Sequence, residues 1–147
     1  MSKRFRLAPL ELVEEHSDEV LFLADASVSD WARIFDHATS RRFSEGETIM
    51  EEGARDRALC FLTEGRLTLV GAAVYKTIEA PSVIGEVAFL DGLPRSAGLV
   101  AATDGEIACL DRDAYEALAA ADPDLARRMA LELGRILALR LRMRDGQ

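Results

Sequence analysis

Short apolar runs, broken by glycines that follow acidic residues, fill the middle of the chain and restrict its fold more than any other feature. Apolar and polar residues alternate around Leu59 and Phe61, and again around Leu67 and Leu69. Acid–glycine pairs interrupt the runs at residues 45–46, 52–53 and 64–65. Alternation with a period of two turns one face of a strand toward a core, and glycines between such runs are turn signals. The pattern predicts an all-β sandwich or barrel.

Helical patterns flank this region. Trp31, Ile34 and Phe35 have the spacing of one helix face, and we expect the cap of that helix at Ser29-Asp30. Beyond the last strands, Asp111 is a candidate cap, and a final helix is expected to restart at Asp122-Pro123. Its apolar stripe consists of Leu125, Met129, Leu133, Ile136 and Leu137. Leu139, Leu141 and Met143 widen that stripe, which indicates either a second partner or an end that packs on its own barrel.

Residues 84–97 combine a glycine, a carboxylate and an arginine in a pattern that suits a sugar phosphate. Gly85 directly precedes an expected helical turn, where open backbone N–H groups and the helix dipole favour an anion. Arg95 offers a planar charged group for phosphate oxygens, and Glu86 can accept a hydrogen bond from a hydroxyl. The alternative is a structural role, with Arg95 paired to a nearby acid such as Glu86.

The composition excludes several classes of partner. The formal net charge of −8 opposes nonspecific attraction to nucleic acid or anionic membranes. No signal peptide pattern is present, and no run approaches the roughly 18 apolar residues of a membrane span, so we expect a cytoplasmic protein. Cys60 and Cys109 form no Cys-x-x-Cys pair, and we interpret them as two buried thiols. A disulfide would need a strand adjacency that the sequence does not establish.

Catalytic and metal-dependent functions find little support. His16 and His37 are the only histidines, and both precede the expected barrel, which argues against a metal site on its strands. No nucleophile stands near a histidine base, and no glycine-rich triphosphate loop is present. We therefore expect a sensor rather than an enzyme, with no metal and no cofactor.

Residues from about 21 to about 142 resemble the cyclic nucleotide-binding domain, the family of the catabolite activator protein's sensor domain and the protein kinase A regulatory subunit. The upstream part of the resemblance lies in residues 42–53 and 59–67. Its diagnostic part is residues 85–90 together with Pro94-Arg95-Ser96-Ala97, which look like the family's phosphate-binding cassette. A lone Gly-Glu pair carries no weight, but both segments at this separation form a specific signal.

The resemblance implies a role for each matched residue. Arg95 would pair with a cyclic phosphate, Glu86 would accept from the ribose 2′-hydroxyl, and Ser96 would lie near phosphate and base. The final helix would close over the base. The ligand-binding residues so implied are Gly85, Glu86, Val87, Ala88, Arg95, Ser96, Ala97, Arg140 and Leu141.

The resemblance also implies a fold and a function. We expect a mainly β jelly roll (double-stranded β-helix) with an N-terminal helix, a short cassette helix and two C-terminal helices. The expected parts are an arm (1–20), a barrel (21–121) and a lid or dimerisation helix (122–147). The expected function is a cyclic nucleotide sensor, with cAMP favoured over cGMP, forming a homodimer and not binding DNA or membranes. The alternatives are a barrel that binds no nucleotide and serves assembly, or the sensor half of a truncated transcription factor.

Overall fold

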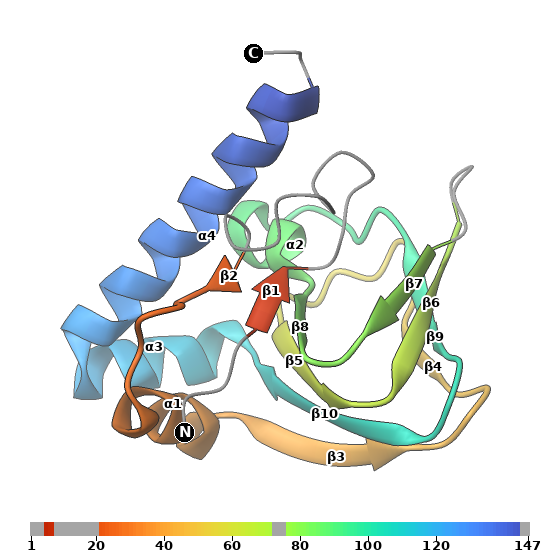
Figure 1. Cartoon of the computed structure of the whole chain (residues 1–147), viewed down its shortest axis with the longest axis horizontal. Coiled ribbons are helices and arrows are strands. Elements are labelled where there is room, and N and C mark those ends of the chain that lie inside the picture. The colour runs from red at the N-terminus through yellow and green to blue at the C-terminus, as the bar shows by residue number, and fades with distance from the viewer. Residues whose placement is uncertain (1–4, 8–20, 72–75, 145–147) are drawn as a thin grey trace.

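Two β-sheets form the body of the molecule in the computed structural model, which describes residues 5–7, 21–71 and 76–144 (Figure 1). The six-stranded sheet has the order β2-β1-β8-β5-β10-β3 and the four-stranded sheet the order β4-β9-β6-β7. All neighbours are antiparallel except β1 and β8. The first sheet consists of β1 (Phe5–Leu7), β2 (Leu21–Phe22), β3 (Thr39–Phe43), β5 (Leu59–Glu64), β8 (Ser82–Ile84) and β10 (Gly105–Leu110). The second consists of β4 (Thr48–Met50), β6 (Arg66–Val70), β7 (Lys76–Glu79) and β9 (Gly98–Ala101).

The described part of the chain has four helices beside the sheets, and this arrangement confirms the predicted jelly roll with flanking helices. They are α1 (Val28–His37), α2 (Glu86–Asp91), α3 (Arg112–Ala121) and α4 (Pro123–Arg144). Figure 1 shows α1, α3 and the start of α4 gathered on one side of the strands, while α2 lies between α4 and the strands. The short helix α2 is therefore placed where a long C-terminal helix can reach it.

Strand β5 separates two hydrophobic cores because its side chains alternate between its two faces. Leu59 and Phe61 face the helices and join a core with Phe22, Trp31 and Leu133. On the opposite face, Cys60 and Leu62 belong to the core between the two sheets. Leu21, Phe22 and Leu23 are also buried. Of the expected N-terminal arm, only β1 belongs to the described residues.

The helix caps follow the sequence with one correction. Asp111 accepts a hydrogen bond from the Ala114 amide, and Asp122 accepts one from the Leu125 amide, as predicted. The cap of α1 is Ser27, not Ser29-Asp30. Asp30 is instead the third helical residue, and its carboxylate accepts from the Ser27 amide while the Ser27 hydroxyl accepts from the Asp30 amide. With this reciprocal capping box the helix begins two to three residues earlier than predicted.

The prediction of two separate thiols is wrong, because Cys60 and Cys109 form a disulfide. Strands β5 and β10 are antiparallel neighbours, and their register places these two cysteines opposite each other, with Cα atoms 4.1 Å apart. Which residues lie opposite each other depends on which strands become neighbours and on their register. The positions of the two cysteines in the sequence therefore could not reveal the disulfide.

Candidate ligand-binding site

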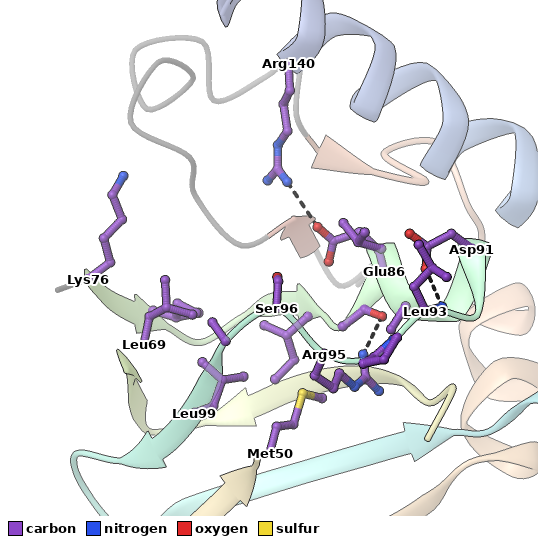
Figure 2. A pocket seen from close by; sticks show the side chains of 17 residues that line it. Met50, Leu69, Lys76, Glu86, Asp91, Leu93, Arg95, Ser96, Leu99 and Arg140 are labelled. Atoms are coloured by element: carbon purple, nitrogen blue, oxygen red, sulfur yellow. Dashed lines mark hydrogen bonds and ion pairs between the residues drawn. The ribbon is translucent and has the colours of Figure 1, made fainter. Parts of the chain in front are cut away.

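A cavity of about 370 Å³ lies among α2, the four-stranded sheet and α4 (Figure 2). This volume falls within the range of about 300–1,000 Å³ that is usual for small-molecule sites. The predicted ligand residues that line it are Gly85, Glu86, Val87, Ala88, Arg95, Ser96, Ala97 and Arg140. The structure thus brings together residues from α2, the following loop and the distant α4.

Leu141 is the predicted site residue that the structure does not bring to the cavity. Its side chain is 56% exposed, whereas that of its neighbour Arg140 is buried. Successive residues on a helix point about 100° apart, so a helix that turns Arg140 inward turns Leu141 away.

Arg95 is held in place by bonds that use all but one of its guanidinium N–H donors. Its Nη1 donates to the Gly85 carbonyl oxygen at 2.8 Å, and its Nη2 donates to the Ala58 carbonyl oxygen at 2.8 Å. Nε and Nη2 also donate to the two carboxylate oxygens of Asp56, at 3.3 and 2.7 Å. The acidic partner of Arg95 is therefore Asp56, not Glu86 as the structural alternative suggested.

Gly85 is required by its backbone and by its neighbours. Its φ of +82° lies in the left-handed region, which residues other than glycine rarely adopt. A Cβ atom there would stand 2.8 Å from both the Ala58 carbonyl oxygen and Nη1 of Arg95. The absence of a side chain thus allows the phosphate-binding candidate Arg95 to lie directly against the start of α2.

The segment containing Asp56 and Arg57 positions both parts of the site, and sequence reasoning missed it. The Arg95 guanidinium holds the pKa of the Asp56 carboxyl below its ordinary value. Arg57 donates to the carbonyl oxygens of Phe89 and Leu90 at the end of α2, at 2.9 and 3.1 Å. Positive charge at a helix C-terminus is stabilising. Only the alternation of charged residues just before β5 could have drawn attention to this segment.

Glu86 and Arg140 form a buried ion pair that joins α2 to α4. Nη1 of Arg140 donates to Oε1 of Glu86 at 3.1 Å, and the two residues are 4% and 6% exposed, respectively. Figure 2 shows the arginine reaching from α4 down to the carboxylate at the edge of the cavity. Burial raises the pKa of Glu86 above its ordinary value, and the Arg140 charge opposes that rise without cancelling it. The carboxylate that faces the ligand cavity is therefore also the one that α4 holds.

The described residues lack two features that would indicate other kinds of site. No helix there has the length and apolar character needed to cross a membrane. The histidine, cysteine and acidic residues of the same part of the chain form no group of three or more that could hold a metal ion.

The family model of the cyclic nucleotide-binding domain matches residues 40–122. Among curated proteins, the cAMP-dependent protein kinase regulatory subunit of Aspergillus fumigatus is 33% identical over 124 residues, which are 80% of this chain and 29% of that protein. The corresponding subunit of Aspergillus niger is 31% identical over 124 residues, 82% of this chain and 30% of that protein. The chain thus spans less than a third of the length of these relatives.

Solved structures agree with the fold described above. The Thermus thermophilus catabolite activator protein superimposes with a TM-score of 0.70 at 27% identity, covering 83% of this chain and 58% of that one. A cyclic nucleotide-binding domain from Methylobacillus flagellatus gives a TM-score of 0.71 at 24% identity, covering 82% of this chain and 71% of that one.

Proposed function

Because the chain belongs to the cyclic nucleotide-binding domain family, we propose that it is a regulatory receptor module whose ligand occupies the cavity beside α2. The observation that carries this proposal is that Arg95, Glu86 and Ser96 all line one cavity. The resemblance assigns Arg95 to the phosphate, Glu86 to the ribose hydroxyl, and Ser96 to the neighbourhood of phosphate and base. Their ion-pair partners, Asp56 for Arg95 and Arg140 for Glu86, hold both residues in place. Such preorganisation reduces the cost of ordering a site when a ligand binds.

The phosphate end of the ligand would be bound by Arg95. One Nη1 hydrogen remains for a phosphate oxygen after the bonds to Gly85, Ala58 and Asp56 are counted. The Ser96 side chain is exposed beside it and offers a hydroxyl. A charge-assisted bond inside a cavity is stronger than one at an open surface, which makes this end the main source of affinity.

The ribose end would couple the ligand to α4. A ribose 2′-hydroxyl can donate to the Glu86 carboxylate, which now accepts from Arg140. Binding would change the number and geometry of the bonds that Glu86 makes, and Arg140 would pass this change to α4. A ligand shifts a conformational equilibrium only when it interacts differently with the two states, and the shared carboxylate supplies that difference.

The names of the relatives support cAMP as a ligand, since they are called cAMP-dependent regulatory subunits. The words "regulatory subunit" in that name also support a regulatory rather than a catalytic role for this chain. The direct test is calorimetric titration of the chain with cAMP and cGMP, with 5′-AMP as a matched nucleotide that lacks the cyclic phosphate. We expect at least one cyclic nucleotide to bind in the micromolar range and 5′-AMP to bind at least tenfold more weakly. If neither cyclic nucleotide binds at millimolar concentration, the receptor function is contradicted and the assembly alternative is favoured.

An exposed face of α4 supports a homodimer as the second part of the proposal. Leu131 and Leu141 are 60% and 56% exposed, and Gly134 and Ala138 lie between them. Their spacing of three, four and three residues is that of a two-helix interface. A Cβ added at Gly134 would meet nothing within 4 Å, so this face has room for a second helix. A second copy of the chain can offer the same face in return.

A further inference from the structure

Lys76 turns its side chain into the cavity from the edge strand β7. Side chains alternate along this strand: Thr77 and Glu79 are exposed, while Ile78 is buried on the cavity side and Lys76 lies on that same side, half-buried. Its register partner on β6 is Leu69, which also lines the cavity. A lysine therefore stands on the face of the strand where the pattern places apolar residues.

The ammonium group of Lys76 has no hydrogen-bond or ion-pair partner within the part of the chain that the structure describes. A lysine ammonium carries three donors and no acceptor. Its neighbours on this wall, Leu69, Ile78 and Leu99, offer no polar side-chain atoms. Lys76 is thus a cation available to an acceptor inside the cavity.

Lys76 lies in the part of the cavity where the base of the proposed nucleotide would bind. Figure 2 shows Lys76 and Leu69 on one side of the cavity and Glu86 on the other, with Ser96 between them. Under the proposed function, phosphate and ribose occupy the side of Arg95 and Glu86. The flat base then lies against the four-stranded sheet, where Lys76 is the charged residue.

We propose that Lys76 determines base specificity and favours guanine over adenine, so that this site binds cGMP more tightly than cAMP. This inference rests on the proposed function. The two purines differ at C6: guanine has a carbonyl oxygen there, next to the N7 acceptor, whereas adenine has an amino group that donates. A donor-only ammonium can bond to both guanine acceptors at this edge, whereas on adenine it finds only N7 and meets another donor at C6. Both nucleotides retain the phosphate and ribose contacts, so cAMP still binds.

The charge of Lys76 has a second effect that must be separated from base reading. Both nucleotides carry one negative phosphate, and a cation in the cavity attracts both equally. Removal of the charge therefore lowers both affinities together. Only a contact to the base changes their ratio, which makes the ratio of the two dissociation constants the measurement that tests this inference.

The experiment measures cGMP and cAMP binding by calorimetry for the wild type and four variants. The wild type is expected to favour cGMP by about 5- to 150-fold, the discrimination typical of a good base-edge contact. Lys76→Met should lower that ratio at least fivefold, and Lys76→Arg should retain the preference. Lys76→Gln should move the preference toward cAMP, because an amide can both donate and accept. Arg66→Met removes an equal charge from an exposed position on β6 and should leave the ratio unchanged.

Each outcome decides the inference. A wild type that binds cAMP more tightly, or a ratio that Lys76→Met leaves unchanged, overturns the role of Lys76 while the receptor function stands. A wild type that binds neither nucleotide overturns both. If Lys76→Met fails to fold, the comparison of Lys76→Arg with Lys76→Gln carries the test, because both keep a long polar side chain.

Discussion

Single residues at the proposed phosphate end of the cavity depend on contacts made away from it. Arg95 donates to two backbone carbonyl oxygens and to Asp56, so its guanidinium is oriented before any ligand arrives. Gly85 makes this arrangement possible because it leaves space for Nη1 of Arg95. The site is therefore sensitive to substitutions that add one atom or remove one charge.

Gly85→Ala is expected to destabilise the fold and to abolish tight ligand binding. The added methyl group would be strained by the left-handed backbone and would come too close to Ala58 and Arg95. We expect it to lower the free energy of unfolding by at least about 1–3 kcal/mol. Gly46→Ala is the matched control, since its φ is +89° but nothing lies within 4 Å of the added atom. Denaturant unfolding should show a larger loss for Gly85→Ala. Equal losses would mean that the contact with Arg95 does not matter.

Asp56 is expected to make stability depend on pH at the acidic end. Its pKa is lowered by Arg95, so the folded state favours the carboxylate. The stabilisation is fully present above the unfolded pKa of about 3.9 and is lost as the pH falls through the lower, folded value. Asp56→Asn should lower the melting temperature at pH 6, and its difference from the wild type should shrink below about pH 4. A difference that is constant with pH would contradict the pairing of Asp56 with Arg95.

At the scale of elements, the buried ion pair between Glu86 and Arg140 links α4 to the proposed ligand site. Glu86 begins α2 and Arg140 lies near the end of α4, so the pair joins residues 54 positions apart. A buried charge that loses its partner costs more than the pair contributes. The two helices should therefore respond together to any change at either residue.

We expect Arg140→Met and Glu86→Gln each to lower the free energy of unfolding by up to about 5 kcal/mol. The double variant should lose less than the sum of the two single losses. For Arg140→Met the loss should be larger at pH 8 than at pH 5. Burial already raises the pKa of Glu86, so the folded state retains its proton longer than the unfolded chain and stability falls as the pH rises. Chemical denaturation at both pH values measures the free energy of unfolding of the wild type and of each variant. Additive losses would show that the two residues do not interact.

Elements that come from contiguous sequence were predictable, whereas those that depend on register were not. The cassette residues from Gly85 to Ala97 are close in sequence, and every predicted ligand residue within that stretch lines the cavity. Asp56 lies in a loop and Lys76 on β7, and the local sequence around each does not show that it comes close to residues 85–97. The Cys60–Cys109 disulfide likewise required the pairing of β5 with β10. Helix periodicity located α4 but could not distinguish Arg140 from Leu141 as the residue that lines the cavity.

At the scale of the whole molecule, the free face of α4 is where a second copy would bind. The same helix carries Arg140 on its inner side and Leu131 on its outer side. A change in α4 caused by the ligand would therefore reach the proposed interface without an intermediate element.

Leu131→Glu is expected to convert a dimer to a monomer without disturbing the fold, because the side chain is exposed in a single chain. Like charges facing each other across a helix pair are destabilising. Sedimentation equilibrium measures the mass, and Ala117→Glu, which adds the same charge at an exposed position of α3 away from this face, serves as the control. A wild type that sediments as a monomer at all concentrations would contradict the proposed dimer.

The most direct test of the proposed receptor function is the affinity of Arg95→Ala for the cyclic nucleotide that the wild type binds. Loss of the buried partner of the phosphate is expected to cost about 2–5 kcal/mol of binding free energy, or about 30- to 5,000-fold in Kd. Arg55→Ala, at an exposed arginine that does not line the cavity, should bind as the wild type does. If Arg95→Ala, shown to be folded by its unfolding transition, binds the nucleotide as tightly as the wild type, the phosphate does not bind where we have placed it.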